Sequence, residues 1–193
     1  MLLQCSPIKF TEQSPGVTTV PAVDIPAGND DLVCDLIAKP NALGVLRQNT
    51  VKHYYSSGAF NLIQLVMYIL RQTGPAHIFL STYSISERSI TALKHRLDDG
   101  RILSARFLID NRVRSISPKP YDHLITSFPD SVRCRAIHAK VALIYNNDWH
   151  VSVVGSQNAT HNPKLERGII HTQEQIFNFD FKILNHEFES GTT

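Results

Sequence analysis

Two short apolar runs, separated by one helical segment, constrain the fold of this chain more than any other part of its sequence. Residues 77–82 and 102–110 have the composition of buried strands. Between them Ser86 can cap a helix that ends at Gly100, and apolar residues recur on one face of that helix. A strand–helix–strand order with short connections predicts two parallel strands joined by a right-handed crossover.

Further elements are expected on both sides of this unit. Residues 60–72 have a broad apolar face and are followed by a Gly-Pro pair, which predicts a helix with a defined end. Residues 132–145 have a long strand pattern, and a turn at 146–148 followed by a strand at 151–154 predicts a hairpin. Another short strand is expected at 168–171.

The C-terminal segment is expected to form an amphipathic helix that lies on the sheet. Its large apolar side chains recur at helical spacing, at Phe177, Phe181, Leu184 and Phe188. Together these patterns predict an α/β fold: a mixed, largely parallel β-sheet flanked by helices on both faces. The length of 193 residues corresponds to about one domain.

The first 50 residues differ in composition from the rest. Five of the ten prolines lie within the first 40 residues, and proline disfavours long regular elements. Valine, leucine and isoleucine recur among these prolines, as they do in segments that pack on a core. We therefore predict that residues 1–50 form an arm of loops and short strands packed on a catalytic domain at 51–193.

Cysteine usage and hydropathy favour a cytoplasmic protein. The three cysteines are widely separated and include no Cys-x-x-Cys pair, which argues against a disulfide framework or a zinc knuckle and for a reduced compartment. Residues 1–10 lack the basic start and apolar run of a secretory signal. The longest apolar stretch, at 62–70, is far short of the ~20 residues needed to cross a bilayer. We expect no membrane association.

One segment carries residues suited to chemistry on a phosphodiester. Residues two apart on a strand share a face, so His138 and Lys140 are expected to point the same way. An imidazole can attack phosphorus, and an ammonium group can neutralise the non-bridging oxygens. The pair therefore indicates a nucleophile beside a cation.

A second cluster follows the predicted hairpin. In Gly155-Ser156-Gln157-Asn158, the glycine allows close approach of the backbone, and Ser156 and Asn158 offer neutral donors to phosphate oxygens. Glu166 comes ten residues after Ser156, and a carboxylate there can hold the second N–H of the imidazole. Taken singly, each of these residues is commoner in scaffolding than in a site, but their ordered combination indicates a functional site.

This combination resembles the signature of the phospholipase D superfamily, and the resemblance extends over roughly residues 55–190. It implies that His138 forms a phosphohistidine, that Lys140 and Asn158 bind the phosphate, that Ser156 assists and that Glu166 orients the histidine. It also implies that neither a metal nor another cofactor is needed.

The sequence departs from the family pattern after the lysine. Tyr145 stands where the family usually has an aspartate, and Asp148, three residues later, is expected in the turn. The hairpin between Tyr145 and Gly155 is also longer than is common in the family. A catalytically degenerate nucleic-acid-binding or assembly module of the same fold is therefore an alternative to an enzyme.

The number of motifs predicts an assembly. Covalent relay needs two histidines, one to attack and one to protonate the leaving oxygen, and the chain contains a single His-x-Lys. Single-motif members of the superfamily resemble small bacterial endonucleases that pair two chains about a two-fold axis. We therefore expect a homodimer in which each copy contributes His138.

Charge distribution favours a nucleic acid as substrate. Residues 101–140 contain eight basic and three acidic residues, a local net charge of +5 in a chain whose total is +2. The candidate substrate-binding residues are Arg112, Arg114, Arg133 and Arg135. We expect a metal-independent phosphodiesterase or nuclease that acts on DNA or RNA, with DNA favoured.

Two other enzyme classes fit the sequence less well. A phospholipid phosphodiesterase would use the same chemistry, but no membrane-facing amphipathic stretch supports it. A metallohydrolase that uses His150, His161 and His171 lacks a compact ligand spacing.

Overall fold

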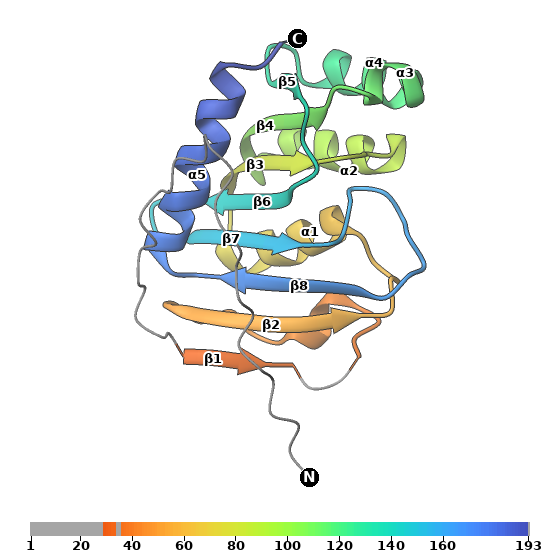
Figure 1. The fold of residues 1–193 in the computed structure, drawn as a ribbon. Coiled ribbons are helices and arrows are strands. Elements are labelled where there is room, and N and C mark those ends of the chain that lie inside the picture. Colours follow the sequence, from red (N-terminus) through yellow and green to blue (C-terminus); the bar gives the residue numbers. More distant parts are fainter. Residues whose placement is uncertain (1–28, 34–35, 193) are drawn as a thin grey trace, which may run out of the picture.

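The computed structural model describes residues 29–33 and 36–192, which include a single mixed β-sheet. In this part of the chain eight strands are hydrogen-bonded in the order β1-β2-β8-β7-β6-β3-β4-β5 (Figure 1). Their bounds are β1 Asn29–Leu32, β2 Thr50–Ser56, β3 Ala76–Thr82, β4 Ile102–Asp110, β5 Val132–Arg135, β6 Lys140–Tyr145, β7 His150–Gly155 and β8 Glu166–His171.

The helices lie on both faces of this sheet. Five α-helices and a short 3-10 helix are found among the described residues. Their bounds are η1 Pro40–Leu43, α1 Leu62–Thr73, α2 Glu87–Asp98, α3 Val113–Ile116, α4 Pro118–Ser127 and α5 Glu174–Glu189. The predicted α/β class, with a mixed sheet and helices on both faces, is confirmed.

Parallel pairing is confined to the two sides of the sheet. Strands β3, β4 and β5 pair in parallel, as do β1 and β2, whereas the four pairings from β2 through β8, β7 and β6 to β3 are antiparallel. The predicted crossover through α2 between β3 and β4 is confirmed, and so is the β6–β7 hairpin. The parallel share of the sheet, three of its seven described pairings, is smaller than predicted.

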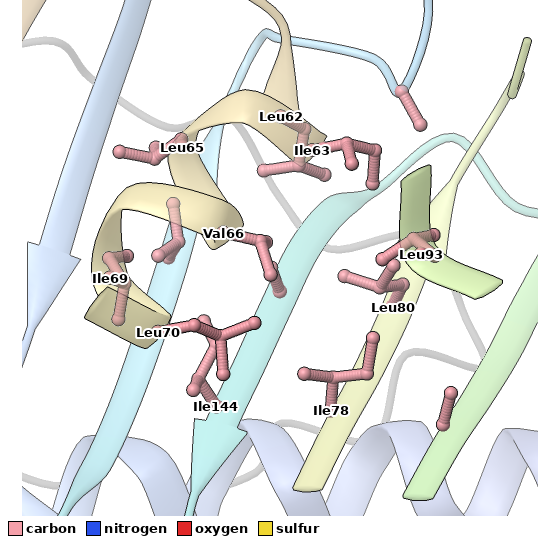
Figure 2. Close-up of a cluster of buried hydrophobic side chains, with 14 of the residues drawn as sticks. Leu62, Ile63, Leu65, Val66, Ile69, Leu70, Ile78, Leu80, Leu93 and Ile144 are labelled. Carbon is pink, nitrogen blue, oxygen red and sulfur yellow. The ribbon is translucent and has the colours of Figure 1, made fainter. Parts of the chain in front are cut away.

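Helices α1 and α2 cover one face because their ends are capped and their apolar faces are broad. Asn61 and Gln64 form a reciprocal capping box at the start of α1, and Ser86 accepts a hydrogen bond from the Ser89 amide at the start of α2. The apolar side chains of α1 project toward the strands, where Ile78 and Ile144 meet them (Figure 2). This layer forms the larger of the two cores.

Helix α5 covers the other face over β4 to β7 (Figure 1). Phe177, Leu184 and Phe188 are its buried residues, and they pack with Phe79 of β3. The Phe79 and Phe188 rings meet edge to face, with centroids 5.5 Å apart. The amphipathic helix predicted from the spacing of large apolar residues is thus confirmed.

Three segments differ from the prediction. Residues 132–145 form two strands, because β5 pairs with β4 at the edge of the sheet and the chain must pass to the other side of the β3–β4 pair before β6 can begin. Residues 118–127 form a helix, α4, for which no helix was predicted. Strand β2 was not predicted as a strand, although it pairs with β8 over six residues.

The predicted arm falls mainly outside the described residues, which exclude 1–28 and 34–35. Within the part that the structure describes, β1 adds a parallel strand to β2, and Ile37, Leu43 and Leu46 are buried in the larger core. The domain boundary at residue 50 and a cytoplasmic location both stay predictions. No helix among the described residues is long and apolar enough to cross a membrane.

Candidate active site

Strand ends from distant parts of the sequence meet at one edge of the sheet. Because β6 runs antiparallel to both of its neighbours, its first residue lies beside the last residues of β3 and β7. Lys140 is paired with Gly155, which is in turn paired with Gly168 of β8. The sheet therefore brings the His-x-Lys segment and the Gly-Ser-x-Asn segment to the same edge.

His138 and Lys140 lie together at this edge. The Lys140 Nζ lies 3.1 Å from Nδ1 and 3.2 Å from Nε2 of His138, and it donates to the His138 carbonyl at 2.7 Å. His138 is exposed and precedes β6, so the expectation that both residues stand on one strand is wrong for the histidine. Lys140 opens β6 and is 7% exposed. An accessible imidazole next to a largely buried ammonium group is the central feature of the site.

Burial changes the acid–base behaviour of Lys140. It lowers the pKa of the ammonium group, and the negative charge of Glu166 acts in the opposite direction. A cation held away from bulk water interacts more strongly with an anion placed next to it than a solvated lysine does. The Lys140 side chain is therefore suited to neutralise a phosphate oxygen at the surface above it.

Glu166 is held by partners other than the histidine. Its Oε2 accepts a hydrogen bond from the Ser156 hydroxyl, and its Oε1 accepts from Asn162 Nδ2 at 2.8 Å. The carboxylate is buried, and its charge reaches Lys140. The role of orienting His138, expected for Glu166, has no hydrogen bond to support it among the described residues.

Asn158 anchors the loop after β7. Its side-chain Oδ1 accepts from Thr82 Oγ1 at 3.4 Å, and its carbonyl accepts from the Leu62 amide at 3.1 Å. These bonds tie the loop to the end of β3 and to the start of α1. The structure therefore places Asn158 at the same edge as Lys140, with its amide nitrogen available as a donor.

Gln157 fills the variable position between Ser156 and Asn158, and sequence reasoning gave it no role. The Tyr54 hydroxyl donates to its Oε1 at 2.6 Å, and its Nε2 donates to the Phe60 carbonyl at 3.1 Å. All of these groups are buried, and burial together with the charge of Glu166 raises the pKa of Tyr54. Gln157 thus fixes the loop that carries the two neighbouring donors.

Tyr83 and Asp110 are two further residues that the sequence analysis did not assign to the site. The Tyr83 ring lies 5.3 Å from the His138 ring and 4.8 Å from the Arg112 guanidinium carbon. Asp110 accepts from the Arg112 amide at 3.0 Å, from Arg112 Nε at 2.8 Å and from the Ile137 amide at 3.2 Å. Its bonds to Arg112 lower the pKa of the Asp110 carboxyl. Asp110 therefore joins the end of β4 to the segment that carries His138.

Three of the four candidate arginines contact the end of α5 or the residues after it, and only Arg112 contacts the site. Arg112 reaches Tyr83 at the site, as described. Arg114 donates to Thr192 near the C-terminus, Arg135 pairs with Glu187 of α5, and Arg133 stacks on Phe188 at 5.0 Å. The contacts of Arg133 and Arg135 are therefore with α5, and these contacts give no support to their expected role in substrate binding.

Comparisons with solved structures agree on the architecture. Nuc from Salmonella typhimurium, a phospholipase D family member, superposes with a TM-score of 0.56 at 15% identity over 74% of this chain and 95% of its own. NucT from Helicobacter pylori gives 0.53 at 16% identity over 74% and 98%. Polyphosphate kinase from Porphyromonas gingivalis gives 0.54 at 13% identity over 74% of this chain and 26% of its own.

The chain has a phospholipase D-like fold. No family model and no curated protein sequence matches it. The fold resemblance expected from the two motifs is thus shown by structure, whereas the roles of individual residues rest on their geometry.

Tyr145 occupies the far end of β6 in this phospholipase D-like fold. Its ring stacks on His77 with centroids 5.2 Å apart and packs against Phe177 of α5 at 5.3 Å. A cavity of about 600 Å³ adjoins this end of the strand, and Asp148 lines it from the β6–β7 turn. The residue that replaces the family aspartate therefore belongs to an aromatic cluster, five residues along the strand from Lys140.

A metal centre has no candidate ligand set here. Within residues 29–33 and 36–192, no group of three or more histidine, cysteine, aspartate or glutamate side chains is arranged to hold an ion. His161 lies in the loop before β8, whereas His171 ends that strand and pairs with Ser152 near the start of β7. The three histidines of the metallohydrolase alternative are therefore not gathered at one place.

Proposed function

We propose that this protein is a metal-independent phosphodiesterase that cleaves DNA or RNA, with DNA favoured, through a phosphohistidine on His138. The observation that carries this proposal is the exposed His138 ring with Lys140 Nζ about 3 Å from both of its nitrogens. The phospholipase D-like fold supports it, and so does the pairing of Lys140 with Gly155 at one sheet edge. This chain covers 95% of Nuc and 98% of NucT, so those two proteins are close in size to the matched part of this chain.

The proposed reaction has two steps. In the first, a neutral His138 nitrogen attacks phosphorus, the P–N bond forms, and the bond from phosphorus to the leaving oxygen breaks as that oxygen takes a proton from a second imidazole. In the second, the same imidazole accepts a proton from water, the water oxygen attacks phosphorus, and the P–N bond breaks. Lys140 and Asn158 bind the non-bridging oxygens. Ser156, whose hydroxyl donates to Glu166, assists them.

The second imidazole is proposed to be His138 of another copy of this chain. The chain contains one His-x-Lys, and His138 is exposed at the sheet edge, where a second copy can approach it. Pairing about a two-fold axis brings the two histidines to one phosphate. The homodimer is therefore part of the catalytic proposal.

Cleavage in the presence of excess chelator tests the chemistry. We expect turnover of plasmid DNA and of a chromogenic phosphodiester by the wild-type protein, and loss of both in His138→Ala. His95→Ala is the matched control, since His95 is exposed on α2 and away from the strand ends of the site. A reaction stopped with denaturant at alkaline pH, where the P–N bond of a phosphohistidine survives, should leave the phosphate-linked part of the substrate bonded to His138. A chelator-sensitive reaction, or full activity in His138→Ala, would contradict the proposal.

A catalytically degenerate nucleic-acid-binding module is the second candidate function. Two observations favour it: Tyr145 occupies the position of the family aspartate, and Glu166 makes no hydrogen bond to His138 among the described residues. DNA binding that is equal in the wild type and in His138→Ala, without turnover, would select this function. Hydrolysis of phosphatidylcholine but not of nucleic acid would instead select a phospholipid substrate.

A further inference from the structure

A tyrosine–arginine pair lies on the part of the sheet face that α5 leaves uncovered. Tyr55 of β2 is paired with Arg167 of β8, and the guanidinium carbon lies 5.5 Å from the ring centroid. Tyr54 and Ser56 are buried on the side of α1, so Tyr55 projects toward the opposite face. It is 48% exposed, and Arg167 is exposed as well. A large aromatic ring and a cation are thus presented together to solvent.

The backbone of Arg167 joins this pair to the candidate active site. The Ser156 amide donates to the Arg167 carbonyl at 3.0 Å, and the Arg167 amide donates to the Ser156 hydroxyl at 3.0 Å. Three strand spacings separate β6 from β2, which is on the order of 14 Å. A few nucleotides of an extended strand can cover this distance along the sheet edge.

Neighbouring side chains hold the guanidinium in place. Arg167 Nη2 lies 3.2 Å from His53 Nδ1, and His53 Nε2 lies 3.8 Å from Asp30 Oδ1. His53, which lies two residues before Tyr55 on β2, therefore restrains Arg167. An arginine restrained beside an aromatic ring is arranged to contact an anion while the ring contacts a flat apolar group.

We infer that Tyr55 and Arg167 form a nucleotide subsite that accepts an unpaired base, with the base stacked on the Tyr55 ring and the adjacent phosphate held by Arg167. This inference rests on the proposed function, in which Lys140 binds the phosphate that is cleaved. The same nucleic-acid strand would continue from there to Arg167. A base inside a duplex has both faces covered by its neighbours, whereas a base in a single strand has a face free for stacking. The substrate class is therefore single-stranded nucleic acid.

Removal of one base from the ligand tests the subsite without altering the subsite residues. In a His138→Ala background, which prevents cleavage, fluorescence anisotropy compares a labelled single-stranded oligonucleotide with a series that carries one abasic position each. Because stacking on an aromatic ring stabilises a bound base, we expect one abasic position to weaken binding about tenfold. The remaining positions should change the dissociation constant much less.

Variants of the ring identify the residue responsible. Tyr55→Ala should weaken binding of the intact oligonucleotide to the level of the sensitive abasic one, and Tyr55→Phe should retain wild-type affinity. Phe179→Ala is the matched control, because Phe179 is an aromatic side chain that is 63% exposed on α5. Thermal unfolding verifies that each variant is folded. If Tyr55→Ala does not fold, Tyr55→Leu and the abasic series still decide the question.

The outcomes separate this inference from the proposed function. Equal affinity for every abasic ligand, or tighter binding of a duplex than of the single strand, would overturn the subsite. Position-dependent stacking without any cleavage by the wild-type protein would contradict the phosphodiesterase proposal alone. Cleavage that is insensitive to removal of a base a few nucleotides from the scissile phosphate, together with unaltered binding in Tyr55→Ala, would overturn the subsite and leave the pair with only the β2–β8 strand contact.

Discussion

At the scale of single residues, Lys140 combines burial with a positive charge that has no close carboxylate. No acidic oxygen among the described residues lies within ion-pair distance of its Nζ. Burying a charge without a paired partner opposes folding, which is why its pKa is lowered. Such an arrangement is favourable only when an anion completes it, and a bound phosphate would do so.

The pH profile of cleavage should report this lysine. Because burial lowers the pKa of Lys140 from the ordinary 10.5, activity should fall on the alkaline side at a lower pH than a solvated lysine would give. Glu166 raises the same pKa, so Glu166→Gln should move the alkaline limb to still lower pH. Profiles of kcat/KM measured by chromogenic assay provide the test.

Asn162→Ala is the control for this shift. It removes a hydrogen bond to the Glu166 carboxylate but keeps the charge, so its alkaline limb should remain where the wild-type limb is. A limb that moves upward in Glu166→Gln would contradict the electrostatic account of Lys140.

The Tyr54–Gln157 hydrogen bond should contribute measurably to stability. Tyr54→Phe leaves the buried Gln157 Oε1 without its donor, and the expected loss is about 1–3 kcal/mol of unfolding free energy. Tyr68→Phe removes a comparable bond to the Gly44 carbonyl, but an exposed one, and should cost much less. Urea denaturation measures both, and equal losses would contradict the importance of burial at Gln157.

At the scale of elements, α5 supplies the cover for one face of the sheet. Leu184→Ala should lower the free energy of unfolding by about 2–5 kcal/mol, because it opens a cavity against β3 and β6. Ile183 is the adjacent residue on the same helix and is 51% exposed, so Ile183→Ala should cost far less. Chemical denaturation of the two variants makes the comparison, and similar losses would show that α5 is not seated as described.

Elements with a strong repeating pattern could be predicted from the sequence, and elements defined by their partners could not. The periodicity of α5 and the composition of β3 and β4 depend on local residues, so both were predicted. The break between β5 and β6 depends on the sheet order, which local patterns do not encode. Strand β2 was missed because polar residues occupy its buried positions, where Lys52 pairs with Asp31 and Tyr54 with Gln157.

Some features of the candidate site could also be predicted from the sequence, and others depend on the fold. The His138–Lys140 proximity follows from a spacing of two residues, with Lys140 at the start of β6 and His138 just before it. The partners of Glu166 do not follow from the sequence, because Ser156 and Asn162 reach it through the shape of the β7–β8 loop. Asp110 belongs to the site only because β4 ends beside the segment before β6, so its role required the fold.

At the scale of the whole molecule, the proposed homodimer makes a prediction about mixtures. If each active centre needs His138 from both copies, a mixed dimer with His138→Ala is inactive. Activity after exchange should then fall with the square of the wild-type fraction, whereas His95→Ala should not suppress it. Activity that falls linearly with the wild-type fraction would contradict the shared centre. So would full activity of a protein that analytical ultracentrifugation shows to be a monomer.

The place of β2 in the sheet has a consequence for biosynthesis. Among the described strands, β2 is bonded only to β1 and β8, and the residues of β8 are translated more than 100 positions after those of β2. During translation the open side of β2 has no native neighbour until β8 leaves the ribosome, and such long-range pairing slows folding and leaves an unpaired strand edge exposed. Completion of the sheet edge that carries the candidate site therefore awaits β8, and nascent chains truncated before β8 should be the species that chaperones retain.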